Sequence, residues 1–110
     1  MGIARSILDE LVIAINGIIE RGVKSIILYG SAARGTADEY SDVDIALIVE
    51  REMTAEENDR LCDVIVDMNL KYGKVFSVID ISGAEFEKWR DVIPFYRNVA
   101  NEGVVLWKAA

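Results

Sequence analysis

Two short motifs in the first half of the chain carry side chains suited to phosphate chemistry. Gly30-Ser31 ends one apolar run, and Asp42-Val43-Asp44 opens another after a gap of ten residues. Glycine lets a backbone approach a phosphate closely, and serine adds a hydroxyl and an amide where a helical turn begins. Alternation along a strand puts both carboxylates on one face, where they can grip one or two divalent cations. Together the two motifs predict a site for a metal-bound phosphate compound.

A third carboxylate, Asp80, lies near the end of a later β-rich run, in which Phe76, Val78 and Asp80 share one face. If that strand neighbours the strand beginning at Val43, Asp80 completes a triad of carboxylates. The alternative is a strand-end residue that precedes a helix cap at Ser82. We expect the triad, with Asp42, Asp44 and Asp80 as metal ligands and catalytic residues.

Arg34 follows the Gly-Ser turn and has two interpretations. It could contact a phosphate together with Gly30 and Ser31, or it could pair with Asp42 or another carboxylate and so fix the loop. The second role is slightly favoured, although Arg34 stays in the predicted nucleotide-binding set.

Other phosphate and metal motifs are missing. Gly30 and Gly35 have the spacing of a P-loop, but Thr36-Ala37 follow in place of Lys-Ser/Thr, and no G-x-G-x-x-G occurs. The chain has no histidine and one cysteine, Cys62, which nearly excludes a zinc site and leaves hard, oxygen-liking cations.

The composition indicates a globular protein. The 110 residues are 52% hydrophobic and 28% charged, with 19 acidic and 12 basic side chains and a net charge of −7. This charge argues against stable binding of nucleic acid. No apolar run approaches the roughly 18 residues of a membrane span, and no secretory signal is visible. With a single cysteine, these features favour a cytoplasmic location without membrane association.

The elements that must position the motifs are short and mixed in kind. Apolar spacing predicts a helix within residues 3–20, and a Thr54/Glu57 capping box predicts a second over 55–72 with an inner face that includes Cys62. Further helices follow Ser82 and restart at Pro94. Strands are expected over 23–29, 43–49, 75–81 and 104–107. Because no full helix separates the first two strands, we expect one domain over 1–110, an α/β (α+β) fold with a mixed sheet of three to four strands flanked by helices.

"GSAARG" followed by "SDVDIAL" resembles the signature of the DNA polymerase beta-type nucleotidyltransferase superfamily. The short length and the ending "IPFYRNVANEGVVLW" look like its minimal nucleotidyltransferase branch. The resemblance implies a nucleotidyltransferase fold. It also implies that Asp42 and Asp44 bind two magnesium ions, that Asp80 binds the catalytic one, and that Gly30 and Ser31 hold the triphosphate of ATP.

The resemblance further implies a function. Members of this branch are commonly encoded beside a HEPN-type RNase toxin and act as its antitoxin, so we expect Mg²⁺-dependent transfer of AMP from ATP to a hydroxyl of such a protein. The alternatives are a non-catalytic antitoxin that acts by contact alone and a nucleotide-binding regulatory subunit. Part of the apolar C-terminal third should stay exposed and dock the RNase or a second copy of the chain; its residues are Trp89, Val92, Ile93, Phe95, Tyr96 and Val104 to Trp107.

Overall fold

A four-stranded mixed sheet forms the centre of the fold. The computed structural model describes residues 3–35 and 42–110. The strand order is β3-β2-β1-β4; β1 pairs antiparallel with β2 and β4, and β2 pairs parallel with β3. The bounds are β1 (Val23–Tyr29), β2 (Val43–Val49), β3 (Phe76–Ser82) and β4 (Val104–Lys108). The predicted mixed sheet is confirmed.

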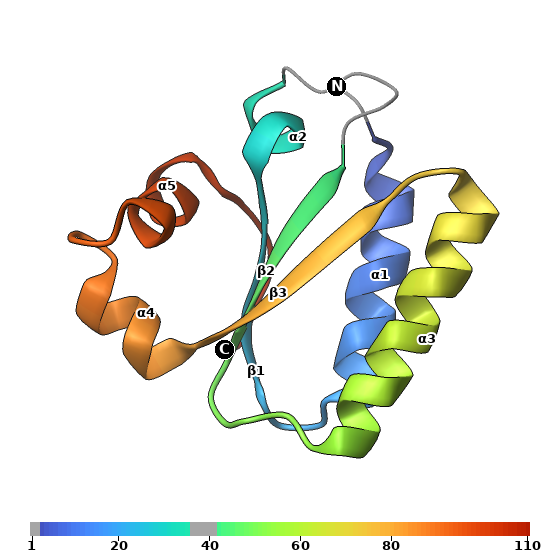
Figure 1. The fold of residues 1–110 in the computed structure, drawn as a ribbon, viewed down its shortest axis with the longest axis horizontal. Helices are drawn as coiled ribbons and strands as arrows, with labels where there is room; N and C mark the ends of the chain where they lie inside the picture. Colours follow the sequence, from blue (N-terminus) through green and yellow to red (C-terminus); the bar gives the residue numbers. More distant parts are fainter. Residues whose placement is uncertain (1–2, 36–41) are drawn as a thin grey trace.

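Helices cover both faces of this sheet (Figure 1). One face carries α1 (Arg5–Ile18) and α3 (Ala55–Tyr72), and the other carries α4 (Gly83–Trp89) and α5 (Pro94–Glu102). The short α2 (Gly30–Arg34) stands at the end of the sheet where β1 finishes and β2 begins. None of the helices in the described part of the chain is long and apolar enough to cross a bilayer.

Two apolar cores follow from the alternation of side chains along the strands. On the α1/α3 side, Ile26 and Leu28 of β1 and Val43, Ile45 and Leu47 of β2 pack with Leu11, Ile15, Leu61 and Met68. On the α4/α5 side, Ile27, Ala46, Ile48 and Ile81 pack with Phe86 and Val99. β2 is therefore buried on both faces along most of its length, which makes it a rigid support for the residues at its start.

The helix boundaries follow from local signals in the sequence. Thr54 caps α3 by accepting a hydrogen bond from the Glu57 amide at 3.1 Å, and the Glu57 carboxylate accepts one from the Thr54 amide at 2.9 Å. Pro94 begins α5, where its missing amide hydrogen costs nothing. The expected inner face of α3 holds at Leu61 and Met68 but not at Cys62, which is exposed.

Candidate functional site

The β1–β2 pair brings the two motifs together at one end of the sheet. Tyr29 is opposite Asp44 in the antiparallel register, so Gly30, the next residue, lies beside the Asp44 side chain. Gly30 has a φ of +75°, and a Cβ atom built on it would lie 2.5 Å from Asp44 Oδ2. Glycine is required here both by the backbone conformation and by the space. The Gly-Ser turn and the second carboxylate are therefore neighbours.

Asp44 carries a charge that the protein alone compensates poorly. It is half-buried on β2, whereas Asp42 is exposed just before the strand. Burial raises the pKa of the Asp44 carboxyl, the nearby charge of Asp42 raises it further, and the Arg34 guanidinium opposes the rise. A bound cation would remove the conflict, because it would favour the ionised form of both carboxylates.

Helix α2 contributes Ser31 and Arg34 to the same end of the sheet. Ser31 is half-buried in the first turn, directly after Gly30, and buried Ala32 anchors the helix to the core. Arg34 Nη1 lies 3.4 Å from Glu102 Oε2 at the end of α5. The carboxylate partner of Arg34 is thus Glu102 and not Asp42. Both side chains are about half exposed, so the ion pair contributes little stability and can yield to another anion.

Asp80 does not join the other two aspartates. Strand β3 neighbours β2 as expected, but Ser77 is opposite Asp44, whereas Asp80 is opposite Leu47. Leu47 points into the core under α1 and α3, while Asp44 shares the opposite face with Ala46 and Ile48. Asp80 therefore lies on the wrong face and about 10 Å farther along the strand. The predicted triad of Asp42, Asp44 and Asp80 is wrong for this reason.

Two residues that border the site, Ser77 and Tyr29, were not predicted from the sequence. Ser77 occupies the position on β3 that faces the site level with Asp44. Tyr29 pairs with Asp44 across the strands, and its pKa is raised by burial and by the Asp44 charge. The tyrosine ring packs edge-on against Phe95, with centroids 5.4 Å apart. The sequence gives no signal for Ser77, because Phe76 and Val78 on one face of the strand and Ile79 and Ile81 on the other are all apolar.

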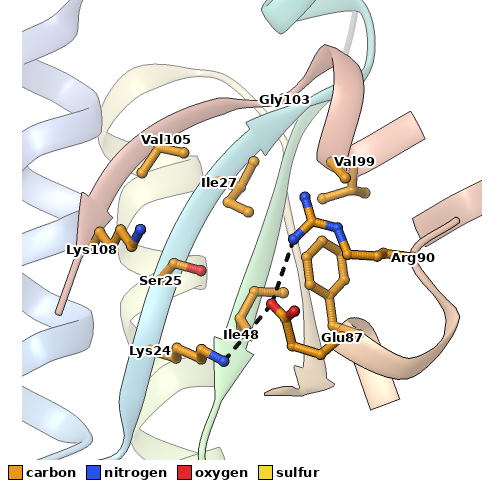
Figure 2. A pocket seen from close by; sticks show the side chains of 12 residues that line it. Lys24, Ser25, Ile27, Ile48, Glu87, Arg90, Val99, Gly103, Val105 and Lys108 are labelled. Atoms are coloured by element: carbon orange, nitrogen blue, oxygen red, sulfur yellow. Dashed lines mark hydrogen bonds and ion pairs between the residues drawn. The ribbon is translucent and has the colours of Figure 1, made fainter. Parts of the chain in front are cut away.

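A pocket of ≈ 230 Å³ lies farther along the same face of the sheet, between β1, β4, α4 and α5. Figure 2 shows Ile27, Ile48 and Val99 around it, with Glu87 between Lys24 and Arg90. Glu87 Oε1 is 3.9 Å from Lys24 Nζ and 3.5 Å from Arg90 Nη1. None of the predicted site residues lines this pocket, so it is distinct from the aspartate site.

The residues at the aspartate site fit a hard divalent cation that carries a phosphate compound. Asp42 and Asp44 supply carboxylate oxygens, the donors that Mg²⁺ prefers, and because Gly30 has no side chain the Asp44 carboxylate can lie against the Gly-Ser turn. Among residues 3–35 and 42–110, however, no group of three or more acidic or thiol side chains could hold a metal ion. The fit rests on two carboxylates.

Comparisons with known proteins agree with this geometry. The model of the nucleotidyltransferase domain family matches residues 11–99. Two proteins of Methanocaldococcus jannaschii, each carrying the name "Putative protein adenylyltransferase", are similar in sequence. The first is 36% identical over 91% of this chain and 94% of its own length, and the second is 34% identical over 66% and 74%.

Solved structures share the fold. One is a crystal structure of a toxin-antitoxin with AMP-PNP, with a TM-score of 0.66, 19% identity and coverage of 97% of this chain and 75% of that chain. Another, a nucleotidyltransferase by name from Sulfolobus solfataricus, has a TM-score of 0.56, 19% identity and coverage of 94% and 79%. The family match spans the Gly30 turn, both aspartates and most of the sheet, and we conclude that the chain belongs to the nucleotidyltransferase family of enzymes.

Proposed function

We propose that this nucleotidyltransferase transfers AMP from ATP to a hydroxyl group on a protein. The observation that carries the proposal is the contact between Gly30 and the Asp44 carboxylate, which brings the Gly-Ser turn beside a side chain of the kind that binds Mg²⁺. The name of the first Methanocaldococcus relative, which aligns with 91% of this chain, supports a protein as the acceptor.

The residues of the site have separate tasks in this reaction. Asp42 and Asp44 would hold Mg²⁺ together with the triphosphate, and the bound ion would neutralise phosphate charge and so favour the departure of pyrophosphate. The Ser31 hydroxyl donates a hydrogen bond to a phosphate oxygen. Arg34 can break its ion pair with Glu102 and bind a second phosphate oxygen. The acceptor oxygen forms a bond to the α-phosphorus and the bond to pyrophosphate breaks, while the hydroxyl proton passes to solvent.

We further propose a HEPN-type RNase toxin as the acceptor, modified on a tyrosine hydroxyl. A protein acceptor needs a surface on which to dock, and apolar side chains are exposed at the start of α5, where Phe95 reaches Tyr29 at the site. Val92, Ile93 and Phe95 are 65%, 37% and 36% exposed, and Phe95 touches Tyr29. Exposed aromatic and aliphatic anchors of this kind are typical of protein interfaces. A chain in the crystal structure of a toxin-antitoxin with AMP-PNP has the same fold, which fits this role.

A second candidate is an antitoxin that binds nucleotide and partner without transfer. The position of Asp80 favours it, since the described residues bring only two carboxylates to the site. The two candidates differ in a single observable, which is covalent modification of the partner.

Co-expression of the chain with its partner, followed by intact-mass measurement of that partner, tests the choice. AMP transfer adds one or more AMP units to the partner, and the Asp42→Asn/Asp44→Asn double variant adds none. A partner that is silenced while its mass is unchanged would exclude transfer and leave inhibition by contact.

A further inference from the structure

The position across the sheet from Asp44 is occupied by Ser77. The two residues are directly opposite in the parallel register of β2 and β3. Their side chains share the face that carries Ile48 and Ile81 farther along the same two strands. Neighbouring strands lie about 4.8 Å apart, so a side chain at position 77 reaches the space in front of Asp44.

This part of the face is open to a ligand. Ser77 is half-buried and Ile79, the next residue on the same side of β3, is 42% exposed. Helices α4 and α5 pack instead over Ile27, Ile48 and Ile81, farther from the aspartates. Position 77 therefore borders the aspartate site and is not buried beneath a helix.

The chemistry of residue 77 then decides how much positive charge the site can hold. Two divalent cations about 3.5–4 Å apart repel one another and need carboxylates around both. Asp42, just before β2, and Asp44, within it, provide two such groups. A serine hydroxyl is a neutral donor, and it leaves the side toward β3 without the charge that a second cation requires.

We propose that residue 77 sets the metal complement of this site, so that Asp42 and Asp44 hold one divalent cation with the nucleotide and a carboxylate at position 77 would add a second. The inference rests on the proposed function, because it assumes that the aspartates bind metal and triphosphate. Position 77, and not position 80, is the place on β3 from which a third carboxylate would reach the site, and in this chain it holds a serine.

Equilibrium dialysis with Mn²⁺ and AMP-PNP tests the inference without any turnover. The measured quantity is the number of Mn²⁺ ions bound per bound nucleotide at saturation. The wild-type chain should bind one, and Ser77→Asp should bind two. Mn²⁺ electron paramagnetic resonance gives an independent readout, since two ions at this separation broaden each other's signal.

Two matched variants control for charge and size. Ile79→Asp adds the same carboxylate to the same strand and face, but about 7 Å farther along, and should still bind one ion. Ser77→Asn changes size without charge and should also bind one. Melting temperatures measured in chelator establish that each variant folds.

The outcomes separate the inference from the proposed function. Two ions in the wild type, one in Ser77→Asp, or two in Ile79→Asp would each overturn the inference while leaving nucleotide binding intact. A wild-type chain that retains neither Mn²⁺ nor AMP-PNP would overturn the proposed function together with the inference.

Discussion

Asp44 is the residue on which the site depends most. It touches the Gly30 turn, and the charges of Asp42 and Arg34 are close enough to shift its pKa. Asp44→Asn should abolish Mg²⁺-dependent nucleotide binding, measured by calorimetry with AMP-PNP. Asp80→Asn removes a carboxylate from the opposite face of β3 and should leave that binding unchanged. Equal losses in the two variants would contradict the placement of Asp80 outside the site.

The raised pKa of Asp44 has a consequence for stability in the absence of metal. A carboxyl whose pKa is higher in the folded than in the unfolded state favours folding at low pH, and this contribution is lost as the pH rises through the folded-state pKa. The ionised Asp44 therefore destabilises the metal-free protein at neutral pH. Asp44→Asn should melt at a higher temperature than the wild type at about pH 7 in chelator, and the difference should shrink toward about pH 3. A variant that melts lower at neutral pH would contradict this.

Substitution of Gly30 should change both the stability of the protein and its binding of nucleotide. Gly30→Ala places a Cβ atom against Asp44 Oδ2 and forces a non-glycine residue to a φ of +75°. The left-handed backbone alone costs roughly 1–2 kcal/mol. Displacement of the carboxylate should weaken Mg²⁺–AMP-PNP binding as well, so urea unfolding and calorimetry should both register the change. Gly35→Ala, at the same φ but with no atom of the described residues within 4 Å of its Cβ, separates backbone strain from the loss of the site.

At the scale of elements, the N-terminus of α3 is the best-defined boundary. Thr54 and Glu57 cap each other, and Arg51 donates two hydrogen bonds of 2.8 Å to the Glu57 carboxylate and one to the Glu20 carbonyl oxygen. Thr54→Ala should lower the free energy of unfolding by about 1 kcal/mol, the usual effect of losing an N-cap, without changing nucleotide affinity. Urea denaturation gives the first quantity. Thr54→Ser keeps the hydroxyl and should restore most of the loss.

The elements were largely predictable because their signals are local. Short runs rich in apolar and β-branched residues define β1 and β2, and the Thr54 cap and Gly73 define α3. Facing was harder. Period-two alternation shows that Phe76, Val78 and Asp80 share a face, but it does not show which face meets Asp44. Cys62 was misplaced for a similar reason: α3 packs on the sheet through a narrow stripe centred on Leu61 and Met68, and the next position is exposed.

At the scale of the whole molecule, charge governs the interaction with ATP. The chain carries a net charge of −7, and two of its acidic side chains stand at the site itself. Both side chains repel a bare triphosphate, and a Mg²⁺ ion between the carboxylates and the phosphates reduces this repulsion because it attracts each of them. Removal of divalent cations with a chelator should weaken ATP binding by roughly tenfold or more, equivalent to 1.4 kcal/mol or above. Calorimetry with and without chelator measures this, and equal affinity in the two conditions would contradict a metal-dependent site.

The position of β4 at the edge of the sheet affects how the protein associates with itself in solution. It forms one edge of the sheet, and its Val104 and Val105 side chains are 42% and 53% exposed. Such an edge can pair with the same strand of another molecule, and like charge is one of the means by which proteins prevent this. The pI of the sequence is ≈ 4.5, so mutual repulsion between molecules vanishes in mildly acidic solution while the apolar edge persists. The protein should therefore self-associate near that pH and disperse again as its negative charge returns, and light scattering across an acid titration would follow both changes.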